Sequence, residues 1–332
     1  MFSTVRARRL RRTALLSLTV AAAVTVGGCG GQDLGKANFS RTTVSAQAGG
    51  GPEKAPEGPI TDPAVASAKL RTVDPCKLIA GPTLADLGTV GETDDFGLSK
   101  CSVEIKDAGG KTIRLSIAIG ESISTGPEDK TGVVEGLPRI ESSNGGYCYV
   151  SALTQRDPNL GVQVQSSYTG GEPCQPAGVA LQKVLQKLHS SPPQFDVAPG
   201  SALGTDLCTV PGDAVLKEIA GADAKATPIG LHRCTWSKTG GATVTLSFTI
   251  AAPSRPSDKN PEVDVDGTKA IQETSKSSST CSLEWAHRKV DDKTSELVKF
   301  AYENYSAQAS SDDPCGKAAK GAKDVLKKLP KP

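Results

Sequence analysis

The fold is decided by KTIRLSI (Lys111–Ile117), a stretch whose pattern returns later in the chain as ATVTLSF (Ala242–Phe248). In both copies apolar and polar residues alternate, and the apolar positions include β-branched side chains. A period of two with such residues predicts a β-strand that is buried on one side only. A glycine pair precedes each copy, Gly109-Gly110 or Gly240-Gly241, and predicts a hairpin turn. The sequence therefore predicts two equivalent half-buried strands.

Eight of the nine cysteines fall into two quartets with similar spacing. Successive members are 25, 47 and 26 residues apart in the first quartet and 26, 47 and 34 apart in the second. The quartets are Cys76, Cys101, Cys148 and Cys174, and then Cys208, Cys234, Cys281 and Cys315. Such self-similarity indicates an internal duplication. We expect a first repeat domain over 68–190, a second over 201–330, and a proline-containing connector between them.

The predicted elements are the same in both repeats. Each is expected to begin with a short helix, as around Asp213 to Ala220, and to close with an amphipathic helix, over 175–189 and 316–329. Further strands are expected near 147–153, 161–168, 281–287 and 296–302. The predicted fold class is α+β: two tandem domains, each an antiparallel sheet with its helices on one face and two disulfides.

The first thirty residues predict export and lipid attachment. Five arginines precede an uncharged run from Ala14 to Val26, which is too short to span a bilayer but typical of a signal peptide over 1–28. Cys29 follows Gly27-Gly28 and resembles the acylated cysteine of the bacterial lipobox. Residues 29–66 hold few large apolar side chains, and this composition predicts a flexible tether. We therefore expect the outer face of the cytoplasmic membrane, with the lipid on Cys29 as anchor; the alternative is a cleaved signal with Cys29 unmodified.

Export would place the eight cysteines in an oxidising compartment, where disulfides persist. Four cysteines allow three connectivities, and the sequence alone does not choose among them. We favour first-to-second and third-to-fourth pairing, because each bridge would then tie a terminal helix to a strand: Cys76–Cys101, Cys148–Cys174, Cys208–Cys234 and Cys281–Cys315. A zinc site is the rival interpretation, but cysteines 25 or more residues apart with no C-x-x-C pair are poor zinc ligands. We expect no metal and no cofactor.

Three motifs carry a family resemblance. Asp74-Pro75-Cys76 opens the first repeat, Cys234-Thr235-Trp236 lies in the middle of the second, and Asp313-Pro314-Cys315 opens the last helix. Together they resemble actinobacterial secreted lipoproteins of unknown function that begin with a D-P-C motif and, more distantly, the extracellular sensor domains of mycobacterial receptor kinases. The chain departs from the pattern at Asp206-Leu207-Cys208 and Glu172-Pro173-Cys174. Because that family has no assigned activity, the resemblance implies a location and an architecture rather than a chemistry.

The charge of the chain argues against a nucleic-acid partner. The full sequence has a formal net charge of +2. Without the five arginines of the predicted signal peptide, which contains no acid, the net charge becomes −3. The remaining chain has no run of basic residues, so it lacks the electrostatic footprint of a nucleic-acid-binding protein.

No catalytic constellation is apparent, and we expect the protein not to be an enzyme. The three histidines, His189, His232 and His287, are best explained as surface or structural residues, and neither G-x-S-x-G nor H-E-x-x-H occurs. Neighbouring acids, as at Asp94-Asp95, Asp291-Asp292 and Asp312-Asp313, are best explained as solvated loop residues, with Asp313 as a helix cap.

Four aromatic residues of the second repeat are the candidate ligand contacts: Trp236, Trp285, Tyr302 and Tyr305. An aromatic groove for a sugar or a lipid headgroup is one interpretation. Filling of a core that is otherwise poor in aromatics is the other, and we favour it. The resulting hypothesis is a lipid-anchored, non-catalytic binding or sensing protein. The alternatives are a scaffold or adhesion protein that engages protein partners and, with the least support, an envelope hydrolase.

Overall fold

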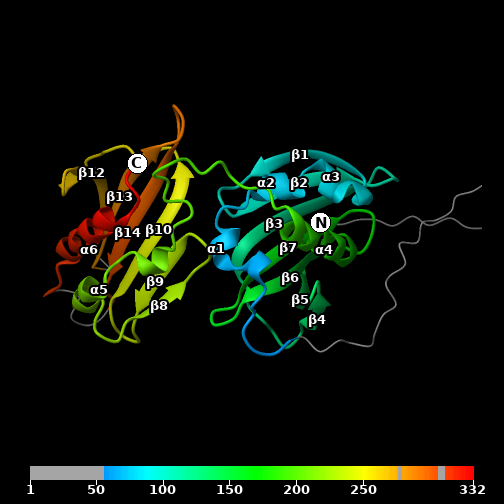
Figure 1. Ribbon diagram of the computed structural model, residues 1–332, viewed down its shortest axis with the longest axis horizontal. Coiled ribbons are helices and arrows are strands. Elements are labelled where there is room, and N and C mark those ends of the chain that lie inside the picture. The colour runs from blue at the N-terminus through cyan, green and yellow to red at the C-terminus, as the bar shows by residue number, and fades with distance from the viewer. Residues whose placement is uncertain (1–55, 276–278, 306–310) are drawn as a thin grey trace, which may run out of the picture. The chain divides into compact units, whose positions relative to one another are not determined.

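A computed structural model of the protein describes residues 56–275, 279–305 and 311–332 (Figure 1). The described residues belong to one compact unit of the chain. The predicted signal peptide, Cys29 and most of the predicted tether lie outside the described residues. Among the described residues, no helix combines the length and the apolar character that a membrane span requires.

The first repeat is built on a seven-stranded antiparallel sheet with the order β1-β2-β3-β7-β6-β5-β4. The strands are β1 (Thr89–Asp95), β2 (Lys100–Lys106), β3 (Thr112–Ser122), β4 (Lys130–Val134), β5 (Leu137–Asn144), β6 (Tyr147–Gln155) and β7 (Leu160–Tyr168). After β3 the chain crosses to the far edge and returns strand by strand until β7 pairs with β3. The pairing of β3 with β7 therefore joins two meanders into one sheet.

The second repeat has the same strand order, read as β8-β9-β10-β14-β13-β12-β11. Its strands are β8 (Lys225–Pro228), β9 (Arg233–Ser237), β10 (Thr243–Ala251), β11 (Glu262–Val265), β12 (Thr268–Ser275), β13 (Thr280–Lys289) and β14 (Ser295–Glu303). Here β10 pairs with β14 as β3 pairs with β7. The two sheets and their disulfides fit the predicted two-domain α+β fold, and the shared topology agrees with a duplication.

Four of the described helices begin at a capping aspartate: η1 (Pro63–Val65), α2 (Pro75–Ile79), η3 (Leu207–Thr209) and α6 (Pro314–Lys328). The other described helices are α1 (Ser67–Leu70), α3 (Gly81–Leu84), η2 (Ala85–Leu87) and α4 (Cys174–Ser190) in the first repeat and α5 (Asp213–Ile219) in the second. The side chain of Asp74 accepts from the N–H groups of Cys76 and Lys77, and Asp206 accepts from that of Cys208. Asp313 accepts from the N–H of Gly316, which confirms its predicted capping role.

One face of each sheet carries the core. Helix α4 packs against β6 and β7, and α6 packs against β13 and β14 (Figure 1). In β3 the buried side chains Ile113, Leu115, Ile117 and Ile119 alternate with polar residues, as the sequence predicts. The first core is almost wholly aliphatic, whereas the second also buries Trp236, Trp285, Phe300 and Tyr302. On the opposite face, Ser116 and Gln165 at the centre of the first sheet are partly exposed, whereas Ala118 and Ser151 in the next row are buried.

Each repeat contains two disulfides that tie a helix to a strand. Cys76 bonds to Cys101, Cys148 to Cys174, Cys208 to Cys234 and Cys281 to Cys315. This is the first-to-second and third-to-fourth pairing that the sequence favoured. The bridges attach α2 to β2 and α4 to β6 in the first repeat, and η3 to β9 and α6 to β13 in the second.

The folded part begins before residue 68, the start expected from the sequence. Val65 is fully buried, Ile60 packs against the first core, and Asp62 accepts from the N–H of Ala64. The composition of residues 29–66 did not predict this, because only a few apolar residues of a largely polar segment join the core. The connector is also held in place: Gln194 pairs with Val73 as an isolated β-bridge, and Phe195 packs against the second core.

Removal of one bridge should destabilise the protein without changing its fold. We expect Cys281→Ser/Cys315→Ser to lower the free energy of unfolding by about 3 kcal/mol, because the unfolded chain loses a loop constraint. Urea titration followed by far-UV circular dichroism measures the change. An unchanged midpoint under non-reducing conditions would contradict a closed bridge in the exported protein.

Candidate functional site

The four candidate aromatics of the second repeat separate into a buried group and one exposed residue. Trp236, Trp285 and Tyr302 are 3%, 2% and 0% exposed and belong to the second core, whereas Tyr305 is 70% exposed. The alternation of β9, β13 and β14 turns the first three toward the helices. This placement corrects the groove interpretation for these three and favours core filling, because a side chain without exposed surface cannot contact a ligand in this conformation.

Tyr302 belongs to a polar network at the edge of that core. Its hydroxyl donates to Asp312 Oδ2 at 2.5 Å, the Asn304 amide donates to the same oxygen at 2.6 Å, and Lys317 Nζ lies 2.6 Å from Asp312 Oδ1. Burial alone would raise the pKa of Asp312, but the hydrogen bonds from Asn304, Lys317 and Tyr302 outweigh it and lower the pKa to about 2. The network orders the start of α6 and shows no open position for a ligand among its described members.

Neutralising this carboxylate should cost stability. We expect Asp312→Asn to lower the free energy of unfolding by about 1–3 kcal/mol at pH 7, because the ammonium of Lys317 would lose its anionic partner. The pKa of Asp312 is lowered in the folded protein. The contribution of its carboxylate to the free energy of unfolding is therefore present above the unfolded pKa of 3.8 and disappears as the pH falls toward 2. Urea titrations of both proteins between pH 7 and pH 2.5 test this; an equal difference at both ends would contradict it.

The three histidines have structural surroundings. His189 Nε2 lies 2.6 Å from Asp62 Oδ2, and its Nδ1 lies 2.9 Å from the carbonyl of Leu185. This pair holds the start of the folded chain against the end of α4. The hydrogen bond that His189 donates to the Asp62 carboxylate raises the pKa of His189 despite partial burial. Partial burial would raise the pKa of Asp62, but the bonds to His189 and Ala64 lower it.

The other two histidines are not paired with an acid. His232 is 8% exposed, and burial, helped by the charge of Arg71, lowers its pKa to about 4. Its imidazole is therefore neutral at physiological pH. His287 Nε2 contacts the carbonyl oxygen of Gly200 at 3.0 Å. None of these histidines contacts a serine or threonine hydroxyl in the described part of the chain, as nucleophilic catalysis would require.

The His189–Asp62 pair predicts a specific pH dependence. The pKa of His189 is raised in the folded protein. The contribution of the His189–Asp62 pair to the free energy of unfolding is therefore complete below the unfolded pKa near 6.5 and is lost as the pH rises through the folded pKa. We therefore expect His189→Gln to destabilise the protein by less than about 1 kcal/mol at pH 5.5 and by less still at pH 9.

Urea titrations at the two pH values measure this difference. The control is Asp62→Asn, which should reproduce it; the double variant should add little, because both single changes remove one interaction. A loss of stability that grows with pH would contradict the assignment.

Acid pairs and the disulfides offer no metal site within the described ranges. Asp291 closes a turn by accepting from the N–H groups of Lys293 and Thr294. Glu141 lies near the sulfur atoms of Cys148 and Cys174, but those sulfurs are bonded to each other and supply no thiolate. Glu141 is instead paired with Lys130 and Arg139.

The outer face of the first sheet is the best candidate site. We use this name for the side chains that point away from α4 in two rows across the strands. Pairing registers align the first row as Asp94, Ser102, Ser116, Gln165, Tyr149 and Ser142, from β1 to β5. The second row is Glu104, Arg114, Ser167, Tyr147 and Asn144. Most of these residues are uncharged and can both donate and accept hydrogen bonds.

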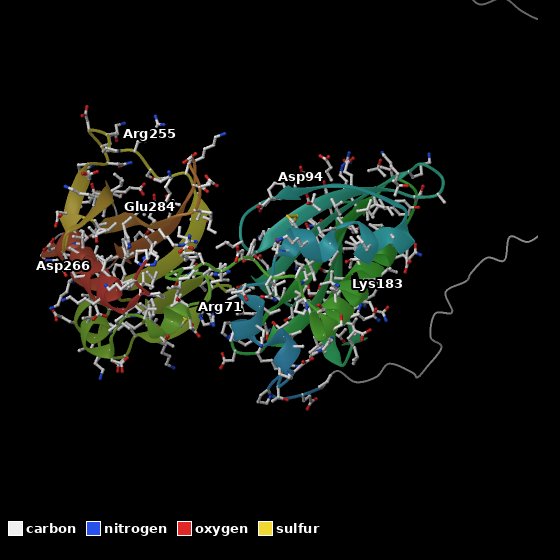
Figure 2. All side chains as sticks on the ribbon, turned by 45° about the horizontal axis from the view of Figure 1, so that its top comes forward. Arg71, Asp94, Lys183, Arg255, Asp266 and Glu284 are labelled. Atoms are coloured by element: carbon white, nitrogen blue, oxygen red, sulfur yellow. A yellow bond between two sulfur atoms is a disulfide. The ribbon has the colours of Figure 1, made fainter. Side chains whose placement is uncertain are left out.

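A shallow hollow of 290 Å³ lies on this face and is lined by members of both rows, among them Ser102, Ser116, Gln165 and Tyr147. Asp94, labelled in Figure 2, lines its β1 side. Tyr147 is 46% exposed. At the rim Arg114 Nε donates to Glu104 Oε1 at 2.6 Å, so these two charges compensate each other.

Apart from Arg114 and Glu104, which bond each other, the described polar side chains at the centre of this face do not hydrogen-bond to one another. Within the described ranges, no protein hydrogen bond is recorded for the side chains of Ser102, Ser116, Gln165, Tyr147 or Tyr149. Water must satisfy them in the free protein, and a ligand with matching groups can replace that water. The face is therefore chemically suited to recognise a polar ligand.

The equivalent face of the second sheet differs in charge. With the disulfide cysteines as reference, the register places Thr235, Thr245, Ala301 and Ser282 where the first sheet has Ser102, Ser116, Gln165 and Tyr149. The charged groups lie in the next row of the same face, which consists of Arg233, Ser247, Lys299 and Glu284. These groups are engaged: Lys299 Nζ bonds Glu273 at 2.9 Å, and Ser254 donates to Glu284 at 2.6 Å. No aromatic side chain occurs in either of its aligned rows. The two repeats share a topology but not a surface chemistry.

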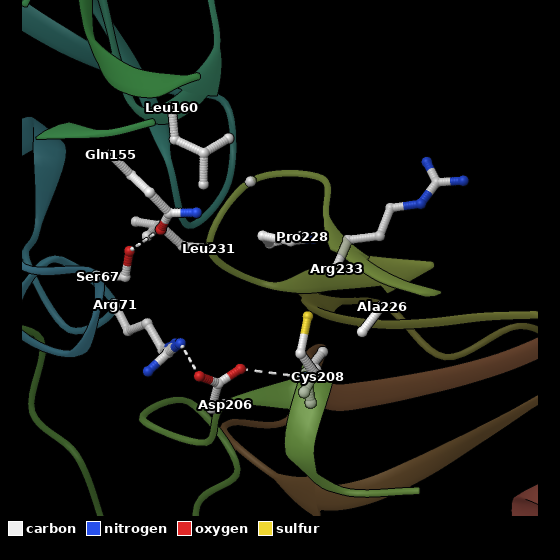
Figure 3. Close-up of a pocket in the computed structure, with 12 residues that line it drawn as sticks. Ser67, Arg71, Gln155, Leu160, Asp206, Cys208, Ala226, Pro228, Leu231 and Arg233 are labelled. Atoms are coloured by element: carbon white, nitrogen blue, oxygen red, sulfur yellow. Dashed lines mark hydrogen bonds and ion pairs between the residues drawn. The ribbon is translucent and has the colours of Figure 1, made fainter. Parts of the chain in front are cut away.

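Contacts also join residues of the two repeats. Arg71 pairs with Asp206 at 2.7 Å, the same residue that caps Cys208 (Figure 3). Leu231 lies in the first core cluster, and Leu98 packs against the second. Leu98 and Leu231 occupy equivalent positions of the duplication. The hollow beside the ion pair, of 240 Å³, is lined by both repeats and holds no acid–base–nucleophile group.

Comparison with known proteins adds no assignment. No family model and no curated protein matches the sequence. Among solved structures, the chain is similar to DynU16, from the dynemicin biosynthetic locus, with 10% identity, a TM-score of 0.18, and 82% of this chain and 93% of that chain covered. MucB in complex with MucA gives 12% identity, a TM-score of 0.15, and coverage of 70% and 88%. At these scores neither likeness supports an argument about this chain.

Sequence reasoning did not single out the outer face of the first sheet. The available signal was the polar half of the alternation in KTIRLSI, continued by Gln163, Gln165 and Ser167 in β7. Attention to rare aromatics pointed instead to the second repeat. The cross-strand register, which brings Tyr147 beside Ser167, could not be read from sequence.

Proposed function

We propose that the protein is a lipid-anchored, non-catalytic binding or sensing protein on the outer face of the cytoplasmic membrane. The observation that carries the proposal is the outer face of the first sheet, where the side chains of five residues lining or flanking a hollow have no hydrogen bond to the described part of the protein: Ser102, Ser116, Gln165, Tyr147 and Tyr149. Four disulfides support an oxidising compartment. The lipobox-like sequence ending at Cys29 supports the anchor, and the tether up to about residue 59 would hold the folded part away from the bilayer.

The absence of catalysis is part of the proposal. All eight cysteines of the two repeats are bonded in pairs, so none offers a thiolate. In the described part of the chain the acid of lowest pKa, Asp312, is enclosed by its own hydrogen bonds. A hydrolase would instead hold a perturbed acid or a nucleophile beside an accessible cleft.

A scaffold that docks partners through its sheet edges has less support. The edge strands β8 and β11 contain four residues each, β8 ends at Pro228, and β4 begins with Lys130. The longer edge strand β1 carries three acids and a register shift between Val90 and Thr93. Short strands, proline, charge and bulges are the devices that block edge-to-edge pairing.

Loss of the acylated cysteine should release the protein. In cells that express Cys29→Ser, we expect the protein to move from the membrane fraction to the medium, because no described helix can retain it in the bilayer. Immunoblots of membrane and medium measure the distribution. Ser45→Ala, in the same segment, is the control and should stay with the membrane. Retention of Cys29→Ser in the membrane fraction would refute the lipid anchor.

A further inference from the structure

The outer face of the first sheet is a surface of hydroxyl and amide groups with aromatic rings beside them. Ser102, Ser116 and Gln165 follow one another across neighbouring strands, and Tyr149 continues the row. Tyr147 and Ser167 lie side by side in the adjoining row. Neighbouring strands lie about 4.8 Å apart, so the six-residue row extends over roughly 24 Å. This is an elongated site rather than a pocket for one small molecule.

The charges on this face select against an ionic ligand. Arg114 is compensated by Glu104, which leaves Asp94 as the uncompensated charge lining the hollow. A phosphate or carboxylate polymer would approach a slightly negative surface without a free cation. A cationic ligand would meet one exposed acid rather than a cluster. The complementary ligand is therefore uncharged.

The same face is unlike a protein interface. Among the side chains of these two rows, Tyr147 is the large one that is strongly exposed. The residues around it include Ser, Gln and Asn. Protein partners usually bury a contiguous apolar patch, which this face does not present. Groups that donate and accept hydrogen bonds, next to an aromatic ring, fit a ligand with many hydroxyl groups and apolar C–H edges.

We propose that the outer face of the first sheet binds an uncharged glycan chain, with Tyr147 as the stacking platform and Ser116 and Gln165 as hydrogen-bonding groups. The proposal rests on the proposed function and names its ligand class. It also assigns different roles to the two repeats. The equivalent row of the second sheet, Thr235, Thr245, Ala301 and Ser282, has no aromatic side chain in it, and the charged Arg233, Lys299 and Glu284 lie in the row next to it.

Binding to defined oligosaccharides tests the proposal. The full-length exported protein, extracted in a detergent without a sugar headgroup, is titrated calorimetrically with hexasaccharides of N-acetylglucosamine, glucose (β-1,4 and α-1,4) and mannose. The hexasaccharide of galacturonic acid is the charged comparison. We expect saturable binding of at least one neutral hexasaccharide and none of the charged one. Failure of all neutral hexasaccharides to bind at millimolar concentration would overturn the proposal.

Matched variants locate the site. We expect Tyr147→Ala and Gln165→Ala each to weaken binding roughly tenfold, and Ser116→Ala to weaken it by a few fold, since a net hydrogen bond contributes about 0.5–1.5 kcal/mol. Ser247→Ala, a serine on the outer face of the second sheet, should bind as the unmodified protein does. All four positions lie on the solvent side of a sheet, so the melting temperature should change little.

Two results would place the ligand elsewhere. Unchanged affinity of Tyr147→Ala, with the melting temperature preserved, would remove the site from this face. Stronger binding of the charged hexasaccharide would contradict the selection for an uncharged ligand. The fractionation of Cys29→Ser tests the membrane location of the protein separately. The glycan proposal can therefore fail while the envelope-binding proposal stands.

Discussion

The pairing of the third strand with the seventh is the interaction on which each repeat depends. β3 with β7, and β10 with β14, join an early meander to a later one that has travelled to the far edge of the sheet. This contact closes a long loop before many other contacts can form, so chain entropy opposes it. The disulfides offset part of that cost by fixing the terminal helices to strands on either side of the joining pair.

A sheet with helices on one face separates two tasks. The inward side chains of β3 and β10 are apolar in both repeats, because both must cover a hydrophobic core. The outward side chains do not have to cover a core, and their residue types differ between the two repeats. The row of serine, glutamine and tyrosine in the first repeat corresponds to a row of threonine, alanine and serine in the second. Surface chemistry is therefore where the copies of the duplication diverge.

The cores differ in a complementary way. The first repeat fills its core with aliphatic side chains, and its tyrosines at 147 and 149 remain on the outer face. The second repeat buries its tryptophans and Tyr302, and a buried phenol needs a partner, which Asp312 provides. Three of the four candidate aromatics of the second repeat thus serve packing, whereas Tyr147 of the first repeat is exposed.

The sequence by itself predicted the duplication, the α+β class, the central strands and the closing helices, because each rests on a local period or on spacing that occurs twice. It favoured one of the three disulfide pairings without deciding it. It did not reveal the edge strands β4 and β11 or the early start of the fold at Val65, since short segments carry weak patterns. Only the tertiary structure decided which tyrosines are exposed and that Ser102, Ser116 and Gln165 form one row. Cross-strand register sets those neighbours, and register is a property of the assembled sheet rather than of any one strand.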